Sequence, residues 1–219
     1  MIKACIFDLD GVVVDTAKYH YIAWKKLANS LGFDFTEADN EKLKGVSRMG
    51  SLDLILEWGG KTFDEEKKKA LAEQKNHWYI EFIEKMKPDE ILEGVEEFLE
   101  DLKQRKMKTG LGSASKNARR IVEKVGLVDN FEVIIDGTLT EKSKPHPEVF
   151  LKAAAAMGVR PDECIVFEDA EKGIEAALSG GFFAVGVGEP EVLHLAHVII
   201  PGFKDFNFDQ LLLTLQETV

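Results

Sequence analysis

Hydrophobic and polar positions divide the chain into short apolar runs and longer amphipathic segments. The apolar run at 2–7 stops abruptly at Asp8, which is typical of a buried parallel strand. Similar runs predict strands at 107–112, 131–135, 164–167, 183–187 and 198–200. Helical spacing predicts helices at 93–105, 115–125, 147–157, 171–179 and 207–217. This alternation predicts an α/β core, a doubly wound, Rossmann-like parallel sheet with helices on both faces.

The stretch between the first strand and the alternating region carries helical signals only. Helix starts are expected at Asp15 or Thr16 and near Thr36, Ser47 and Asp64, and the last helix is long. This all-helical block interrupts the alternation directly after the first strand. We therefore expect two domains, a core made of 1–15 and 88–219 and a small inserted helical cap made of 16–87.

Composition narrows the choice of partners and compartment. With 28 Lys and Arg against 39 Asp and Glu, the formal net charge is −11, so neither nucleic acid nor an anionic membrane surface is expected as a partner. No apolar run is long enough to span a bilayer, and the start lacks the pattern of a signal peptide. Cys5 and Cys164 lie in strand-like runs, where free thiols in a reducing cytoplasm are expected. A monomer is expected.

Polar residues that could carry chemistry follow four of the predicted strands. They are Asp8 and Asp10, then Ser113 to Ser115, then Lys144, then Glu168 and Asp169. Each has an ordinary explanation when taken alone, such as a turn carboxylate, a helix cap or a surface lysine. In a doubly wound sheet, however, ligands bind beyond the carboxyl ends of the strands. Their order at successive strand ends therefore indicates a shared site.

Those residue types suit phosphoryl transfer. Converging carboxylates repel one another unless a hard cation lies among them, and oxygen ligands beside a phosphate favour Mg²⁺. Asp8 can attack phosphorus and form an acyl phosphate, while Asp10 can exchange a proton with the leaving or entering oxygen. Ser113 and nearby backbone N–H groups can hold phosphoryl oxygens, and Lys144 can offset their charge. The sequence thus predicts a magnesium-dependent phosphotransferase.

The same segments resemble a known superfamily. IKACIFDLDGVVVDT, TGLGSAS, SKPHPEVF and CIVFEDAEKGIEAA are similar to the four ordered motifs of the haloacid dehalogenase superfamily, in its phosphotransferase branch. DTAKYHYIAW, LKGVSRMGSL, QKN and SASKN are similar to segments of the β-phosphoglucomutase family within it. One segment, DGTLTEKS at 136–143, departs from that family's pattern.

The resemblance implies a role for particular residues. Asp8 would be the nucleophile and Asp10 the acid/base, with Asp8, the Asp10 carbonyl, Glu168 and Asp169 on the magnesium side. Ser113, Ala114 and Lys144 would hold the transferring phosphate, and Arg48, Ser115, Lys116 and Asn117 the other phosphate. Thr16, His20 and Lys75 would couple cap closure to Asp10. The other substrate-binding residues it implies are Trp24, Gly45, Val46, Ser47, Ser51 and Asn76.

The cap residues also have plainer interpretations. His20 and Trp24 fit the packed face of a helix, and Lys75 fits the solvated face of a charged one. Arg48 is different, because a cation in the first turn opposes the helix dipole, which favours an anionic partner.

Two functions follow from the resemblance. An isomerase would interconvert β-D-glucose 1-phosphate and D-glucose 6-phosphate by way of phospho-Asp8 and glucose 1,6-bisphosphate. A phosphatase would pass the same phosphoryl group to water. Arg48 favours the mutase, because a bisphosphate needs a second anion site. A catalytically silent binding protein is disfavoured, since every chemical position holds a competent residue.

Overall fold

A single parallel sheet organises the molecule. The computed structural model describes residues 1–218, with side chains to Leu215, and residue 219 of the expected core lies outside them. The strands are β1 (Ala4–Phe7), β2 (Lys108–Gly112), β3 (Val133–Ile135), β4 (Cys164–Glu168), β5 (Phe183–Val187) and β6 (Val198–Ile200). They follow the order β3-β2-β1-β4-β5-β6, and each pair of neighbouring strands in this order is parallel. The predicted fold class is confirmed.

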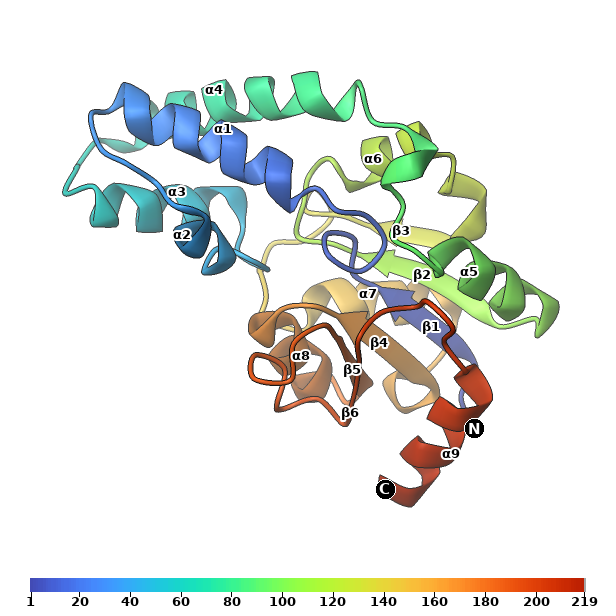
Figure 1. The fold of residues 1–219 in the computed structure, drawn as a ribbon. Coiled ribbons are helices and arrows are strands. Elements are labelled where there is room, and N and C mark those ends of the chain that lie inside the picture. Colours follow the sequence, from blue (N-terminus) through green and yellow to red (C-terminus); the bar gives the residue numbers. More distant parts are fainter. Residues whose placement is uncertain (219) are drawn as a thin grey trace.

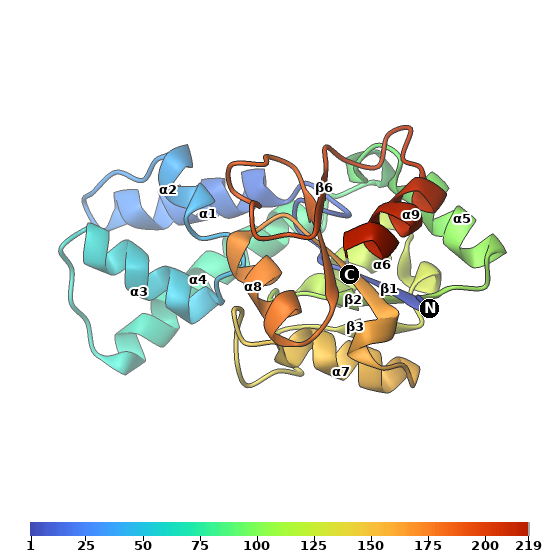
Figure 2. The same cartoon turned by 90° about the horizontal axis from the view of Figure 1, so that it is seen from below.

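Helices cover both faces of this sheet (Figures 1 and 2). On one face α5 (Val95–Gln104), α6 (Ala118–Val125) and α9 (Phe208–Thr218) share a core with Phe7 and Phe167. On the other face α7 (Glu148–Met157) and α8 (Glu171–Ser179) pack around Ile6 and Val166. Residues that alternate along β1 and β4 therefore enter opposite cores, as the two-residue period of a strand requires.

The first strand lies in the middle of the sheet, where the strand order reverses. Phe7 is in register with Leu111 of β2 and with Phe167 of β4. The backbone N–H of Asp8 still donates to the Phe167 carbonyl, at 2.9 Å. The chain leaves the ladder only after that bond, so Asp8 lies at the switch point where doubly wound sheets bind ligands.

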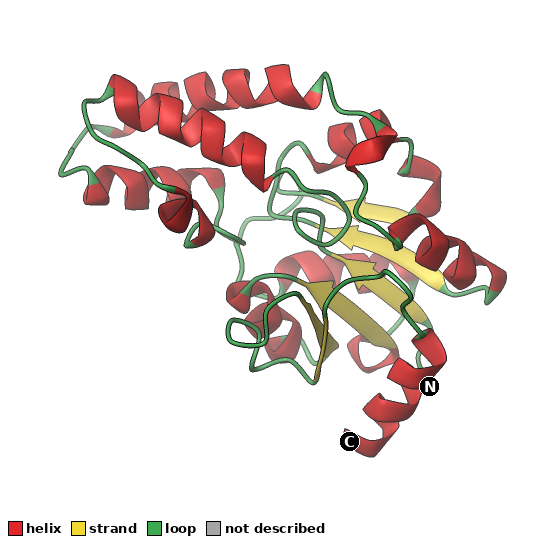
Figure 3. Ribbon diagram, in the orientation of Figure 1, coloured by secondary structure: helices red, strands yellow, loops and turns green. Residues whose placement is uncertain are grey.

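Residues 16–87, all of them described, contain helices and loops but no strand (Figure 3). The helices are α1 (Ala17–Ser30), α2 (Glu37–Glu41), α3 (Arg48–Trp58) and α4 (Glu65–Ile83). Side chains of Thr36, Ser47 and Asp64 accept backbone N–H groups at the starts of α2, α3 and α4. Trp24, Leu27, Leu52 and Ile55 contribute to a separate apolar cluster of this block.

Two segments connect the helical block to the sheet, and they lie together. The Leu92 N–H donates to the Val13 carbonyl at 3.0 Å. The hydroxyl of Tyr19 donates to Glu90, and the Lys18 ammonium lies 3.1 Å from the same carboxylate. Both segments are therefore tied at the first turn of α1.

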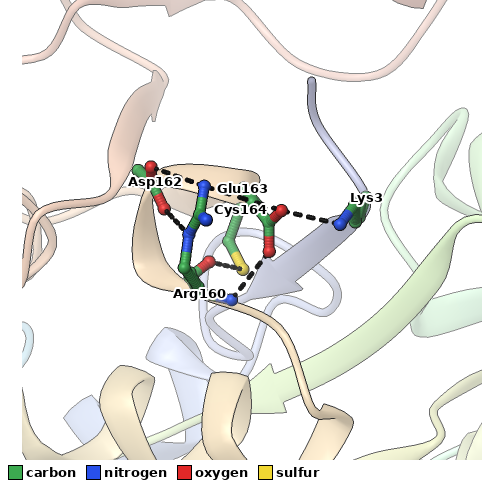
Figure 4. Close-up of polar contacts among 5 residues, drawn as sticks. All are labelled: Lys3, Arg160, Asp162, Glu163 and Cys164. Atoms are coloured by element: carbon green, nitrogen blue, oxygen red, sulfur yellow. Dashed lines mark hydrogen bonds and ion pairs between the residues drawn. The ribbon is translucent and has the colours of Figure 1, made fainter.

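The amino ends of β1 and β4 lie side by side in the sheet (Figure 4). The ammonium of Lys3 lies 2.7 Å from Glu163, and the Cys164 thiol donates to the Arg160 carbonyl at 3.2 Å. Cys5 and Cys164 are buried free thiols, as predicted from the sequence. Burial raises the pKa of both, that of Cys164 to about 12, so neither thiol is activated.

Local differences from the sequence-based expectation are small. Three 3₁₀ turns were not predicted, at Pro88–Glu90, Val128–Asn130 and Pro161–Glu163. The helix expected from residue 115 begins at Ala118, because Ser113 and Ser115 accept local backbone N–H groups and turn the chain first. None of the helices in the described part of the chain combines the length and apolar character needed to cross a membrane.

Candidate active site

A cavity of about 500 Å³ lies where the carboxyl ends of β1 and β2 face the helical block. This volume is in the usual range for a small-molecule site. The predicted site residues in its lining are Asp8, Asp10, His20, Trp24, Gly45, Val46, Ser47, Arg48, Ser51, Lys75, Asn76, Ser113, Ala114, Ser115, Lys116, Asn117, Lys144 and Asp169. Thr16 and Glu168 are outside the lining, and both are buried and contact residues that belong to it.

At the base of the cavity, Lys144 joins two carboxylates. Its buried ammonium donates to Asp8 Oδ1 at 2.5 Å and also to Glu168 Oε1. Burial alone would lower the pKa of Lys144, but the two carboxylates outweigh burial and raise it. Lys144 is therefore a fixed positive charge beside Asp8 Oδ1, which leaves Oδ2 as the carboxylate oxygen that Lys144 does not hold.

The two acidic residues that end β4 occupy space that glycines leave open. The carboxylate of Glu168 lies against Gly173 of α8, and that of Asp169 lies against Gly11. A Cβ at either glycine would overlap the carboxylate, and Gly11 also has a φ of +82°. Burial is the largest cause of the raised pKa of both groups, about 8 for Glu168 and about 6 for Asp169.

The second aspartate of the pair is held from the cap side. The buried hydroxyl of Thr16 donates to Asp10 Oδ1, while the Asp10 N–H donates to Asp8 Oδ2 at 3.0 Å. Burial, and then the Asp8 carboxylate, raises the pKa of Asp10 well above its ordinary value. A carboxyl group that retains its proton beside a nucleophile is suited to general acid chemistry.

The loop after β2 forms the next wall. Ser113 Oγ accepts the Ser115 N–H at 3.1 Å, and Ser115 Oγ accepts the Asn117 N–H at 3.2 Å. The amide of Asn117 reaches the helical block and donates to Asn76 of α4 at 3.0 Å. The loop is thus ordered by its own side chains and bonded to the facing helix.

On the opposite wall, Arg48 begins α3 and is partly buried. No ion pair to its guanidinium exists among the described residues. Burial lowers the pKa of Arg48, although Tyr79 and Glu73 oppose that effect. An uncompensated guanidinium at a helix start, facing a cavity, is suited to an anionic ligand.

Lys75 is buried, although its charged helix had suggested a solvated face. Its ammonium lies 2.8 Å from His20 Nδ1, 4.5 Å from the Trp24 ring centroid and 4.6 Å from that of Tyr79. Burial, with a smaller effect of Arg48, lowers the pKa of Lys75 well below its ordinary value. These contacts bring together three residues that the resemblance had grouped with the cap.

The atypical segment at 136–143 forms part of the rim, through Gly137, Thr140, Glu141, Lys142 and Ser143. Glu148 holds it, since its carboxylate accepts the Lys142 N–H at 2.7 Å and the Glu141 N–H at 3.2 Å. Lys152 pairs with Glu148 and donates to the Leu139 carbonyl at 2.7 Å. This segment leads directly into Lys144.

Asn40, Lys44 and Tyr79 are among the lining residues that sequence reasoning missed. The ammonium of Lys44 lies 3.1 Å from Asp169 Oδ2, which joins the helical block to the end of β4. Lys44 precedes the predicted site residue Gly45, but one lysine in a stretch of mixed charge carries no distinguishing signal. Tyr79 was missed because it fits an ordinary apolar position on α4.

The oxygen atoms at the base of the cavity could supply some, but not all, of the ligands of a divalent cation. Asp8 and Asp169 offer ionisable oxygens toward the cavity, and the burial that raises the pKa of Asp169 would be offset by a bound cation. Glu168 differs, because its oxygens already accept from Lys144 and from the Ala170 N–H. Within residues 1–218, no three His, Cys, Asp or Glu side chains form a ready metal cluster. Backbone carbonyls and water would have to complete the ligand set.

Comparison with known proteins agrees with this geometry. The model of the haloacid dehalogenase-like hydrolase family matches residues 2–181, so the chain belongs to that family. Proteins of this kind generally use a divalent metal.

Individual relatives are more specific. The chain is 42% identical over 211 residues to a β-phosphoglucomutase of Bacillus subtilis, covering 95% of this chain and 93% of that one. The crystal structure of a Clostridium difficile β-phosphoglucomutase superposes with a TM-score of 0.95 at 45% identity, covering 99% and 98%. A phosphorylated carbohydrates phosphatase of Thermotoga maritima is 32% identical over 182 residues, covering 82% of each chain.

Proposed function

We propose that this protein is a phosphomutase that interconverts β-D-glucose 1-phosphate and D-glucose 6-phosphate. One observation carries the proposal: a single cavity has a nucleophile with a fixed cation at one end, Asp8 with Lys144, and an unpaired cation, Arg48, on its other wall. A sugar bisphosphate carries two phosphates, so it needs a cation at both ends of the cavity at once. The similarity to two β-phosphoglucomutases over nearly the whole chain supports the same substrate.

In the first half-reaction, an Asp8 carboxylate oxygen attacks the phosphorus of the bisphosphate. The bond from phosphorus to the sugar oxygen breaks, and Asp10 gives its proton to that oxygen. Lys144 and the Ser113 loop stabilise the charge on the phosphoryl oxygens. The products are phospho-Asp8 and a sugar monophosphate.

The second half-reaction reverses these steps with the other sugar hydroxyl. Asp10, now a carboxylate, takes the hydroxyl proton as the sugar oxygen attacks phospho-Asp8, and the bond to Asp8 breaks. Between the two halves the sugar must turn round, and Arg48 with Ser115, Lys116 and Asn117 holds whichever phosphate is not reacting.

We propose Mg²⁺ as the metal, with Asp8, the Asp10 carbonyl and Asp169 as its ligands and Glu168 beside them. When bound, it supplies a charge that draws the phosphoryl group toward Asp8 and lowers the repulsion among the carboxylates. Oxygen-only donors support this choice over softer metals.

We propose further that residues 16–87 act as a cap domain that closes over the core made of 1–15 and 88–219. Closure would expel water, which is needed because water competes with the sugar for phospho-Asp8. The proposal also includes a monomer and a cytoplasmic location, and free thiols favour that location. The net charge of −11 supports the absence of nucleic-acid and membrane partners.

The alternative is a sugar-phosphate phosphatase that uses the same aspartyl phosphate. Its support is the relative from Thermotoga maritima, which is named as a phosphatase of phosphorylated carbohydrates. The unpaired Arg48 favours the mutase, because hydrolysis of a monophosphate needs no second anion site.

The test is an assay with β-glucose 1-phosphate, Mg²⁺ and a trace of glucose 1,6-bisphosphate. Glucose 6-phosphate and inorganic phosphate are measured separately over time. Glucose 6-phosphate should form much faster than inorganic phosphate is released. The reverse order would reject the mutase in favour of the phosphatase.

A further inference from the structure

One buried polar side-chain atom in the described chain has no hydrogen-bond partner, and it is the hydroxyl oxygen of Tyr79. Tyr79 is 1% exposed, lies on α4 and contributes to the cavity wall. A buried hydroxyl without a partner costs about 1–3 kcal/mol, so such groups are rare and call for an explanation. Packing alone does not supply one, since phenylalanine would fill the same space without that penalty.

The surroundings of this hydroxyl point to Asp10. Burial, and then the charge of Asp10, raises the pKa of Tyr79 well above its ordinary value, while a side-chain interaction with the Thr16 hydroxyl, too loose to count as a formed hydrogen bond, lowers it. Thr16 is itself fully buried and donates its proton to Asp10 Oδ1. The oxygen of Thr16 therefore keeps a free lone pair beside the free hydroxyl of Tyr79.

The ring of Tyr79 is fixed by neighbours on the cavity side. The His20 ring centroid lies 4.1 Å from that of Tyr79, and the Lys75 ammonium lies 4.6 Å from it. Thr16 immediately precedes α1, and α1 packs along α4, so a small shift of these helices over a ligand would bring the two hydroxyls together.

We infer that Tyr79 is a positioning residue for the acid/base. When the helical block closes over substrate, the Tyr79 hydroxyl donates to Thr16 Oγ, and Thr16 then holds Asp10 Oδ1 so that Oδ2 meets the sugar oxygen. The inference rests on the proposed function, because it concerns proton exchange with a sugar hydroxyl. Tyr79 touches neither phosphate nor nucleophile in this arrangement, and it acts only through Thr16.

The test is Tyr79→Phe, which removes only the hydroxyl. The melting temperature of the substrate-free variant should stay equal or rise, because an unpartnered buried hydroxyl is lost. Transfer from phospho-Asp8 to a sugar phosphate should nevertheless fall about five- to a hundredfold. Phosphorylation of Asp8 by acetyl phosphate should keep its rate, because acetate leaves without needing a proton from Asp10. Tyr21→Phe, on α1 but outside the cavity, is the matched control and should change neither rate.

A double-mutant cycle isolates the route through Thr16. In a Thr16→Val background, Tyr79→Phe should have little further effect on transfer, because the residue through which it acts is gone. An unchanged transfer rate in Tyr79→Phe, an additive loss in the double variant, or a lower melting temperature with equal loss of both reactions would overturn the inference. Failure of the proposed function looks different, since the wild type itself would then release inorganic phosphate instead of forming glucose 6-phosphate.

Discussion

Lys144 donates to Asp8 Oδ1 at 2.5 Å, although 136 positions separate the two residues in the chain. The contact fixes one oxygen of the proposed nucleophile and places a permanent positive charge at its side. It exists because β1 lies centrally in the sheet and the segment after β3 returns to its carboxyl end. The relationship gives the first prediction.

Lys144→Ala should slow phosphorylation of Asp8 by about 10²–10³-fold, the usual effect of removing one preorganised charge from a transition state. Lys144→Arg should recover only part of the rate, since the larger guanidinium cannot occupy the same buried space. Rapid-quench kinetics with acetyl phosphate measures this step directly. Lys67→Ala, on the exposed face of α4, serves as the control, and a wild-type rate in Lys144→Ala would contradict the assigned role.

Asp8→Asn and Asp10→Asn should affect turnover and phosphoenzyme formation differently. Without the nucleophile no phosphoenzyme can form, so Asp8→Asn should show no turnover. Without the acid/base, turnover should fall by roughly 10²–10⁴-fold, but acetyl phosphate should still label the protein. Intact-protein mass spectrometry reports the label. Detection of phosphoprotein in Asp8→Asn would move the nucleophile elsewhere.

Arg48→Ala should separate the two phosphate sites. Glucose 6-phosphate formation should fall about ten- to a hundredfold, from loss of a charge-assisted contact worth about 1.5–3 kcal/mol. Labelling of Asp8 by acetyl phosphate should survive better, because that donor has no distal phosphate. Arg48→Lys should restore only part of the mutase rate, as the planar fork is lost. Mutase turnover that is unaffected by Arg48→Ala would show that the distal phosphate lies elsewhere.

Mg²⁺ should raise the melting temperature of the substrate-free protein, because a ligand that binds only the folded state stabilises it by mass action. Asp169→Asn should remove most of that increase, since it deletes one of the charged oxygens that face the cavity. Differential scanning fluorimetry across a magnesium titration measures both proteins without relying on activity. Equal increases in the two would exclude Asp169 as a ligand.

The rim segment gives a pH prediction. Hydrogen bonds from Lys152 and from the N–H groups of Lys142 and Glu141 lower the pKa of Glu148 from 4.5 to about 2. A lowered folded-state pKa means that the ionised group stabilises the fold above about pH 4.5, and that this stabilisation is lost as pH falls toward 2. The difference in melting temperature between wild type and Glu148→Gln should therefore shrink over that interval. Glu175→Gln, at an exposed position of α8, should show no such trend.

Much of the fold could be predicted because the local signals agree with the tertiary packing. Thr36, Ser47 and Asp64 cap the helices they were expected to start, and the apolar runs became strands. The part of the site on the core could also be predicted from the sequence, because parallel strands bring their carboxyl ends to one edge of the sheet whatever lies between them in the chain. Asp8, Ser113 and Lys144 needed only the strand order to meet.

The surroundings of the other site residues could not be predicted, because they depend on tertiary contacts that leave no local pattern in the sequence. Lys75 lies in a charged helix, and only the packing of α4 on α1 buries it against His20. Lys44 has ordinary neighbours in the sequence, and its importance comes from its ion pair with Asp169 of the core. Tyr79 also has ordinary neighbours, and only the packing of α4 places it in the cavity wall. The role of Glu148 was hidden for a similar reason, because its partners are backbone N–H groups.

The two glycines beside the acidic pair constrain how this protein can vary. Glu168 and Asp169 keep their positions only while residues 173 and 11 lack a Cβ. An alanine at residue 173 could be accommodated if a smaller side chain stood at 168, and the two positions should therefore change together or not at all. Among relatives, a side chain at either glycine position would mark an altered acidic centre even where the aspartate pair is intact. A saturation library at 11 and 173, scored first for folding and then for turnover, would map that dependence.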